Sequence, residues 1–439
     1  MKKGLWIGLA LISTLAYLWI GYGLNRSHFA ELLVAFAIPF GAYFIMLTWR
    51  KERPSFKYLI GLSVLFRLIF LVAIPSLSDD YFRFLWDGQL IANGFNPFDF
   101  TPHEFEGEFA LKQSLLAGMN SPNYYSIYPP IAQYIYAFAA YLFPNSIWGG
   151  IVSMRLLILL AEIGTLYLLP KLLKLFFMNR EKTLIYALNP LVIVELSGNL
   201  HFEAIVIFFL LLSIYLLQKN TLVLASFSWA FAAACKLTPL ILLPVFLRLW
   251  KWPKPFWFYA FSAFVFLVLW FPFQSFQFWE HFFSSVNLYF STFEFNASIY
   301  YLIRWIWQNA VGYNPIQTLG PILSKLAFIG IIFILWRKKW PNLKSIFTPM
   351  LMAFFLYYSL AMIIHPWYIC IMVFLSLFTK YTFAIIWSFL VLFSYATYQT
   401  ELYEENFILI AVEYILLFGY SGMELLRHAQ NRMPLLILR

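Results

Sequence analysis

Uninterrupted apolar stretches, many of them near the length of about 20 residues that crosses a bilayer as a helix, recur along this chain. The stretch 5–24 is the first, and we expect a retained helix rather than a cleaved signal peptide. Hydrophobic residues make up 62% of the 439 residues and charged residues 11%, which is unlike a soluble domain. A β-barrel would need alternating polarity. The sequence therefore predicts an all-α, polytopic transmembrane helical bundle.

Hydropathy and charge together predict the topology. Most of the 30 Lys and Arg residues fall between crossings on one side, which places both termini in the cytoplasm of a protein of the cell membrane. We expect about 12–14 crossings, and the fourteen candidate segments are 5–24, 29–48, 58–75, 150–170, 183–197, 203–217, 221–234, 237–248, 256–272, 316–336, 346–364, 366–379, 381–398 and 406–426.

Acidic residues gather in the segments predicted to lie outside. One group is Asp79, Asp80, Asp87, Asp99, Glu104, Glu106 and Glu108 in the loop 76–127, and another is Glu401, Glu404 and Glu405. The segments 128–143 and 297–309 are predicted to be interfacial helices of the outer leaflet, the second because of its Tyr and Trp residues.

The predicted organisation is a single integral membrane domain in three parts. Residues 1–75 form N-terminal transmembrane helices, 76–149 form the first large outer loop with juxtamembrane helices and catalytic acids, and 150–439 form the remaining helices with the donor-binding region.

Several classes of function are excluded. The formal charge of +10 reflects basic cytoplasmic loops, and no basic stripe stands on a soluble domain, so nucleic acid is not a predicted partner. Cys235 and Cys370 lie in apolar runs and imply neither a disulfide framework nor a cysteine metal site. The phosphate-binding loop of ATPases and the Gly-x-Gly-x-x-Gly fingerprint are both missing.

The segment 78–88 is the first candidate for chemistry. Ser78 can cap a short helix with Asp79 and Asp80 in its first turn. The membrane face of that helix would then hold Tyr81, Phe84, Leu85 and Ala92. Alternatively, the two carboxylates serve as a general base for a membrane-bound substrate. Composition alone favours the capping role, and two adjacent carboxylates leave a Mg²⁺ or Mn²⁺ site undetermined.

The order of several short motifs resembles that of the GT-C glycosyltransferases, which are multi-spanning enzymes that use polyprenyl-phosphate-linked sugars. Asp79-Asp80, a short amphipathic helix and the turn 92–98 resemble their first outer loop, where an acidic residue is the catalytic base. Tyr128-Pro129-Pro130-Ile131 is similar to their Pro-Pro-Leu helix, although a related branch has Lys in place of Tyr128. The segments 189–191, 198–203, 236–240 and 365–368 resemble motifs of a bacterial mannosyltransferase-like branch.

The resemblance implies a glycosyltransferase that moves a sugar, mannose by analogy, from a polyprenyl-phosphate donor to a hydroxyl of a glycan, lipid or protein acceptor at the outer face. Asp79 is the first choice of catalytic base and Asp80 the second. A leaving phosphate needs cationic donors. The implied substrate-binding residues are Arg83, Asp87, Tyr128, Arg155, His201, Glu203, Lys236 and His365.

Alternative roles are open for several of these side chains. Arg155 and Arg304 can anchor helices at lipid headgroups, and His201 and His365 can bond the backbone at helix ends. For the intramembrane acids Glu162, Glu195 and Glu413 we expect hydrogen bonds between helices. The competing functions are a lipid-linked sugar flippase, a polysaccharide polymerase, and a structural or assembly protein.

Overall fold

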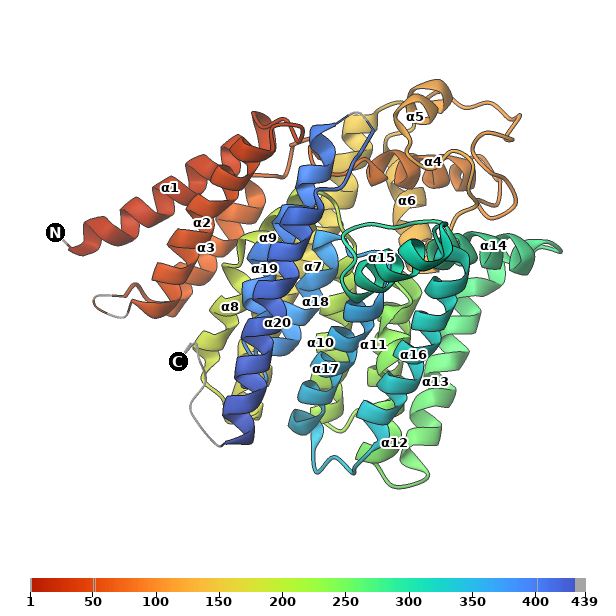
Figure 1. Cartoon of the computed structure of the whole chain (residues 1–439). Helices are drawn as coiled ribbons and strands as arrows, with labels where there is room; N and C mark the ends of the chain where they lie inside the picture. Colours follow the sequence, from red (N-terminus) through yellow and green to blue (C-terminus); the bar gives the residue numbers. More distant parts are fainter. Residues whose placement is uncertain (1, 50, 52, 401, 431–439) are drawn as a thin grey trace.

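A computed structural model describes residues 2–49, 51, 53–400 and 402–430 of the chain. Within these ranges the regular elements are helical, apart from an isolated parallel bridge between Phe295 and Ile363. The predicted all-α polytopic bundle is confirmed (Figure 1). Glu401 and the C-terminal segment 431–439 lie outside the described residues, and with them the prediction for the C-terminus.

The elements follow one another along the chain as α-helices, short 3₁₀ segments (η) and one π-helical segment, η2. They are α1 (Lys2–Tyr22), α2 (Phe29–Thr48), α3 (Phe56–Leu68), α4 (Asp80–Ala92), α5 (Lys112–Gly118), α6 (Pro130–Leu142), α7 (Ile147–Leu175), η1 (Arg180–Lys182), α8 (Thr183–Ala187), α9 (Pro190–Val192), η2 (Ile193–Gly198), α10 (Glu203–Gln218), α11 (Leu222–Cys235), η3 (Thr238–Val245), α12 (Phe246–Leu249), α13 (Lys254–Trp270), η4 (Phe271–Phe273), α14 (Phe278–Ser291), α15 (Ile299–Val311), α16 (Ile316–Trp336), η5 (Leu343–Ile346), α17 (Phe347–Leu360), η6 (Pro366–Tyr368), α18 (Ile369–Ser376), α19 (Phe383–Leu390), η7 (Val391–Gln399) and α20 (Phe407–Ala429).

Fewer of these helices span a bilayer by length than the fourteen crossings expected. Seven described helices are long and apolar enough, and a pair bent by 112°, Pro190–Gly198 with Glu203–Gln218, makes an eighth. The expected crossing 58–75 ends as a helix at Leu68, after 13 residues, which rise only about 20 Å. The expected crossing 183–197 is divided into the short segments α8, α9 and η2. The sequence marks these stretches as apolar, but only packing shows where each helix is interrupted.

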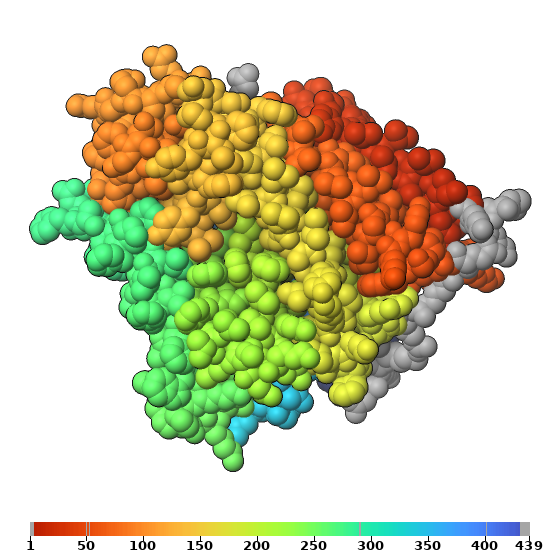
Figure 2. Space-filling model, turned by 180° about the vertical axis from the view of Figure 1, so that it is seen from behind, coloured from red at the N-terminus to blue at the C-terminus, as the bar shows by residue number. Residues whose placement is uncertain are grey.

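The two ends of the bundle differ in charge. At one end, here called the basic end, Lys182 Nζ donates to Leu377 O (3.3 Å) and Lys344 Nζ donates to Phe176 O (3.2 Å). At the opposite, acidic end lie α4 and α5 with the loop 76–127 (Figure 1). Seen from behind, this loop caps one end of the molecule, and α10 and α11 lie beneath it (Figure 2). Both interfacial segments are short helices, α6 and α15, of 13 residues each.

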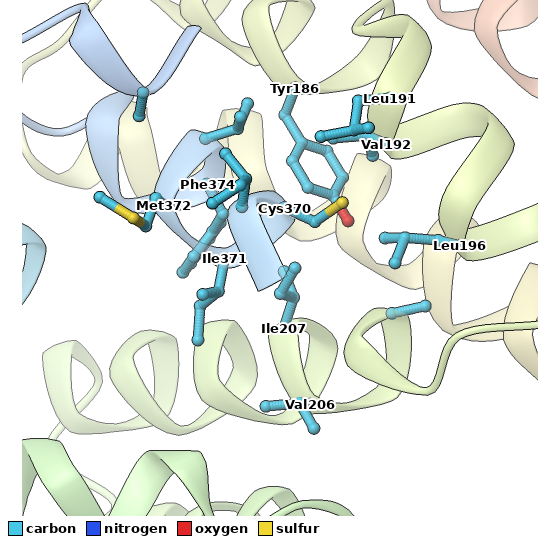
Figure 3. Packing of buried hydrophobic residues seen from close by; sticks show 14 of the residues in the cluster. Tyr186, Leu191, Val192, Leu196, Val206, Ile207, Cys370, Ile371, Met372 and Phe374 are labelled. Carbon is cyan, nitrogen blue, oxygen red and sulfur yellow. The ribbon is translucent and has the colours of Figure 1, made fainter. Parts of the chain in front are cut away.

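The core surrounds α18, which is buried along its whole length because it is apolar on every side. Cys370 and Phe374 of α18 contact Tyr186, Leu191 and Leu196 from the interrupted segment before α10, as part of one large apolar cluster (Figure 3). Cys235 and Cys370 are free and buried.

The buried acids make hydrogen bonds between segments, as expected, although Glu413 Oε2 has no partner among the described residues. Glu162 accepts from Arg67 Nε (2.8 Å) and from the Tyr186 hydroxyl (2.5 Å). Glu413 accepts from Trp387 Nε1 (2.8 Å). Such contacts replace the water that a buried carboxylate loses, so these acids join helices that are distant in the sequence.

The contact between α4 and α6 differs from the expectation for α4. Tyr81, Phe84 and Leu85 were expected on the membrane face, but all three are buried in the protein. Phe84 stacks on Tyr136 of α6 with ring centroids 4.7 Å apart. The backbones approach closely at Gly88, where an added Cβ would lie 2.2 Å from the carbonyl oxygen of Tyr136. Thus α6 and not lipid covers this face.

Replacing Gly88 by Ala should destabilise the protein, because the new methyl group would push α4 and α6 apart. Overpacking of this kind costs about 1–3 kcal/mol of unfolding free energy. Unfolding in detergent, followed by circular dichroism, measures it. Gly41→Ala in α2 is the control, since nothing lies within 4 Å of that position. Equal stability of the two variants would contradict the close contact.

Candidate active site

A cavity of about 860 Å³ opens among the helix ends at the acidic end of the bundle. It brings together residues that are far apart in the sequence, from α4, the loop before α6, α10, the end of α11 and η6. Eight of the ten site residues predicted from the sequence line it: Asp79, Asp80, Arg83, Tyr128, His201, Glu203, Lys236 and His365. Arg155 and Asp87 do not line it.

The two adjacent aspartates have different environments at the start of α4. Asp79 is the residue before the helix, and its carboxylate pairs with Arg26 at 2.6 Å. Asp80 is the first residue of the helix, its backbone N–H donates to Ser78 Oγ (3.3 Å), and its carboxylate accepts from Asn120 Nδ2 (3.3 Å). Asp79 is therefore held by a fixed cation, whereas Asp80 is held by a neutral amide.

Burial raises the pKa of Asp80 above the ordinary value, although His201, Asn120 and Lys236 act in the opposite direction. A carboxylate with a raised pKa is a stronger base when ionised. It accepts a proton from a hydroxyl more readily than an exposed aspartate does.

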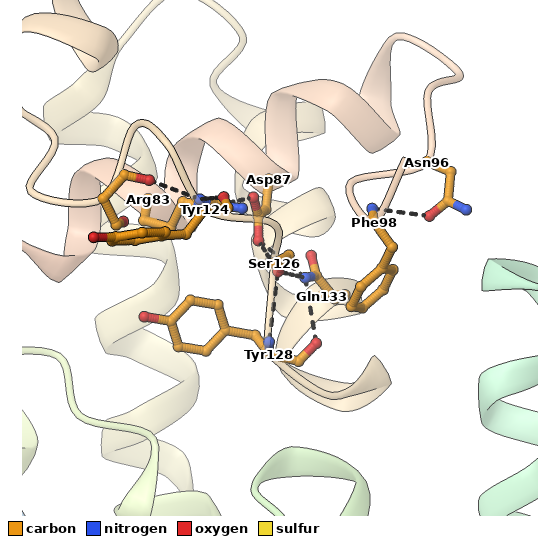
Figure 4. A network of polar contacts seen from close by, with 9 residues as sticks. Arg83, Asp87, Asn96, Phe98, Tyr124, Ser126, Tyr128 and Gln133 are labelled. Carbon is orange, nitrogen blue, oxygen red and sulfur yellow. Dashed lines mark hydrogen bonds and ion pairs between the residues drawn. The ribbon is translucent and has the colours of Figure 1, made fainter. Parts of the chain in front are cut away.

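A buried network fixes the loop over the cavity (Figure 4). Asp87 accepts from Arg83 Nε (2.8 Å), Ser126 Oγ (2.5 Å) and Gln133 Nε2 (3.0 Å). Arg83 Nη1 also donates to the carbonyl oxygens of Ser121 (3.1 Å) and Tyr124 (2.7 Å). Asp87, expected to bind substrate, instead orients Arg83 and this loop. Because α4 places them one turn apart, they face each other along the helix.

Arg83 can do more than hold the loop, because one nitrogen of its guanidinium, Nη2, has no hydrogen-bond partner among the described residues. Its side chain is 3% exposed and lines the cavity. A buried arginine nitrogen without a partner is costly, and an anionic oxygen would satisfy it.

Lys236 and Glu203 form an ion pair on the other wall. Lys236 lies where α11 ends and η3 begins, and its ammonium lies 4.5 Å from the centre of the Tyr368 ring. Glu203 is the first residue of α10. The interruptions of the two helices therefore place a cation and an acid inside the apolar part of the protein, where they are paired.

Stacked rings form another part of the wall. His201 stacks on Trp367 (3.7 Å between centroids), Trp367 on His365 (4.3 Å), and His365 on Phe295 (4.8 Å). Burial lowers the pKa of His365, with His201 and Lys236 acting in the same direction, so its imidazole is neutral near pH 7. Flat aromatic faces of this kind suit the apolar face of a sugar ring.

Arg155, expected to bind the donor phosphate, lies outside the cavity and bonds the backbone. Its guanidinium donates to Ser197 O (2.7 Å), Gly198 O (2.9 Å), Leu71 O (3.0 Å) and Ala73 O (2.5 Å). These carbonyls belong to two interrupted stretches, after α3 and at the end of η2, where no helical N–H reaches them. Arg304, which could alternatively anchor a helix at lipid headgroups, pairs with Glu294.

Several residues of the cavity wall were not predicted from the sequence to belong to the site. Arg26 comes from the connection between α1 and α2 and contacts the Tyr398 ring as well as Asp79 (5.0 Å to the ring centre). Glu405 accepts from the Asn296 backbone N–H (2.5 Å) and from Tyr301, and burial raises its pKa. No local motif distinguishes these residues from ordinary loop residues.

The cavity contains no assembled set of metal ligands in the part of the chain that the structure describes. No group of three or more His, Cys, Asp and Glu side chains has suitable geometry there. Asp79 and Asp80 have different partners, Arg26 and Asn120.

Comparison with known proteins gives a consistent family. A family model described as the N-terminal domain of alpha-(1->6)-mannopyranosyltransferase matches residues 6–252, more than half of the chain. The chain is also 28% identical over 154 residues to alpha-(1->6)-mannopyranosyltransferase B of Corynebacterium glutamicum. That match covers 34% of this chain and 25% of the relative, so the chain spans about a quarter of the relative's length. No solved structure matches this chain.

Replacing Arg155 by Leu should destabilise the fold without weakening binding in the cavity. The substitution leaves buried carbonyl groups unpaired, and we expect a loss of at least about 2 kcal/mol of unfolding free energy. The unfolding midpoint in detergent and the donor affinity of the folded fraction are the two measurements. Lys339→Met, which removes an exposed cation at the basic end, is the control. Reduced donor affinity with unchanged stability would instead indicate that Arg155 contributes to donor binding.

Proposed function

The chain belongs to the alpha-(1->6)-mannopyranosyltransferase family, and from this premise we propose that it is a membrane enzyme of the GT-C type that uses a polyprenyl-phosphate-linked mannose. The acceptor is a hydroxyl of a glycan, lipid or protein, and the transfer takes place at the outer face. The observation that carries the proposal is the cavity that places Asp80 among Arg83, His201 and Lys236.

Asp80 is the proposed catalytic base. Asp79, the first choice from the sequence, forms an ion pair with Arg26, so its carboxylate already has a cationic partner. Asp80 has a raised pKa and lies on the cavity wall. Its basic form is lost only as the pH falls below that raised value, so activity should decline on the acid side at a higher pH than for an exposed aspartate.

The reaction needs one base and several cations. The acceptor oxygen attacks the anomeric carbon, its proton passes to Asp80, and the bond from that carbon to the phosphate oxygen breaks. The polyprenyl phosphate leaves with the bonding electrons and needs no proton. The growing negative charge on the phosphate is stabilised by the unused nitrogen of Arg83 and by Lys236 and His201.

The polyprenyl chain requires an apolar route into the cavity. Ser324 and Ala327 of α16 line the cavity, as do Val286 and Leu288 of α14. Beyond them, the outward face of α16 exposes large apolar side chains that include Leu326, Phe328 and Ile329. We place the lipid tail against this face of α16, since an isoprenoid is stabilised by leaving water.

The competing functions fit the site less well. A flippase needs charged groups along an interior path between the two ends, whereas the charged residues of the candidate site converge in one cavity at the acidic end. An assembly protein has no need of a base with a raised pKa beside cations. The family assignment also favours a transferase.

The test of the proposal is transfer of labelled mannose from a polyprenyl-phosphate donor by the purified protein. Asp80→Asn should lower kcat roughly 10²–10⁴-fold, because the amide cannot accept the proton. Donor affinity should change little.

Two further variants serve as controls for the base. Asp79→Asn should cost less activity, since its partner Arg26 and not the acceptor contacts it. Asp87→Asn should lower stability more than the chemical step. Near-normal turnover by a folded Asp80→Asn protein would contradict the assignment, and loss of activity only in Asp79→Asn would reverse the roles of the two aspartates.

The orientation of the bundle is a separate prediction. The acidic end should face outward and the termini the cytoplasm, so a cysteine at exposed position Phe100 should react with an impermeant maleimide in intact cells. A cysteine at Lys339 should react only after permeabilisation. The native cysteines are buried and give little background. Labelling of Lys339→Cys, but not Phe100→Cys, in intact cells would invert the topology.

A further inference from the structure

The chain is strained and interrupted just before α10. The π-helical segment η2 ends at Gly198, and the chain then bends by 112° into α10. Leu200, within the bend, has φ of +63°, a left-handed conformation that costs a leucine of the order of 1–2 kcal/mol. Single π-helical turns and broken membrane helices are concentrated at functional sites. We therefore expect the bend to have a function in the site as well as a role in packing.

The bend brings a buried glutamate behind a histidine of the cavity. Glu195 is 0% exposed and does not line the cavity, whereas His201, 2% exposed, does. His201 Nε2 lies 3.4 Å from Glu195 Oε2, within the distance of an ion pair, and makes no hydrogen bond among the described residues. The carboxylate accepts from the Tyr395 hydroxyl (2.5 Å) and from Asn199 Nδ2 (3.2 Å). Three groups thus converge on Glu195, and only one of them belongs to the cavity.

Titratable and aromatic groups from several elements surround the imidazole of His201. Glu195 lies behind it on η2, and its ring stacks on Trp367 of η6. Asp80 of α4 and His365 before η6 are further titratable groups that interact electrostatically with His201. The remaining charged groups of this wall, Lys236 and Glu203, form an ion pair with each other.

We propose that Glu195 is a positioning residue for the transfer reaction: it holds the proton on His201 and fixes the imidazolium at the cavity wall, beside the leaving phosphate. The inference rests on the proposed function. When the donor breaks, its phosphate gains a negative charge, and a fixed imidazolium stabilises that charge more in the transition state than in the bound donor. A carboxylate next to an imidazole favours its protonated form. The Tyr395 and Asn199 hydrogen bonds hold that carboxylate in place.

This role differs from the helix–helix bonding expected for Glu195. Both Glu162 and Glu195 accept a tyrosine hydroxyl at 2.5 Å. Glu162, however, pairs with Arg67, which does not line the cavity, whereas Glu195 lies beside His201, which does. The two acids therefore have similar tyrosine contacts, but only Glu195 lies beside a residue of the cavity in which the substrate would bind.

Measurement of kcat/KM against pH for Glu195→Gln tests the proposal. Removing the carboxylate charge should release the imidazole proton at lower pH, so the alkaline limb of the profile should move down by roughly one to three pH units. Glu195→Asp keeps the charge and should restore most of the limb. His201→Gln should remove it, and adding Glu195→Gln to that variant should cause little further loss of activity.

Glu162→Gln is the matched control and should lower stability without moving the limb. A Glu195→Gln profile reduced by one factor at every pH would overturn the proposal and leave Glu195 a packing residue. Absence of transfer by the unaltered protein would instead reject the proposed function.

A measurement on the unaltered protein covers the case in which Glu195→Gln does not fold. The ¹⁵N signals of His201, identified by their absence in His201→Gln, report the protonation of its ring. The proposal expects both ring nitrogens to carry protons at pH 7. A neutral ring at pH 6 would overturn it.

Discussion

The guanidinium of Arg155 satisfies backbone carbonyls at two places where helices are interrupted inside the protein, and the site depends on this arrangement. A bilayer offers no water to unpaired carbonyl groups, so irregular backbone persists there only if side chains bond it. Arg155 bonds the turn after α3 and the end of η2 together. Without it, these carbonyl groups would be buried with no hydrogen-bond partner, at a cost in stability.

The interruptions of the helices position the residues that are proposed to carry out the reaction. Asp80 begins α4, Glu203 begins α10, Lys236 follows α11 and His365 precedes η6. A residue within a regular membrane helix projects toward lipid or toward a neighbouring helix. A residue at a helix end can instead project into a shared space, and several such ends meet at the acidic end of the bundle. The alternation of short and long helices is therefore the feature that makes a polar cavity possible in so apolar a protein.

Part of the candidate site could be predicted because its signals are local. Asp79 and Asp80 follow an apolar run directly, and Lys236 is a charge between two apolar runs that must turn there. The roles of Arg155 and Asp87 could not be predicted, since a sequence places a charge at a helix end without giving the direction of its side chain. Arg26 was missed for the same reason: its partner Asp79 lies more than fifty residues away along the chain.

The sequence by itself determined the all-α membrane architecture and the separation of acidic from basic connections, because hydropathy and charge act residue by residue against the bilayer. It also predicted eight of the polar and charged residues that meet in the cavity. Only the tertiary structure decided which aspartate is free of a cation, which arginine bonds backbone, and that Glu195 lies behind His201. Those outcomes depend on distances between segments that are remote in the chain, and short-range patterns carry no information about such distances.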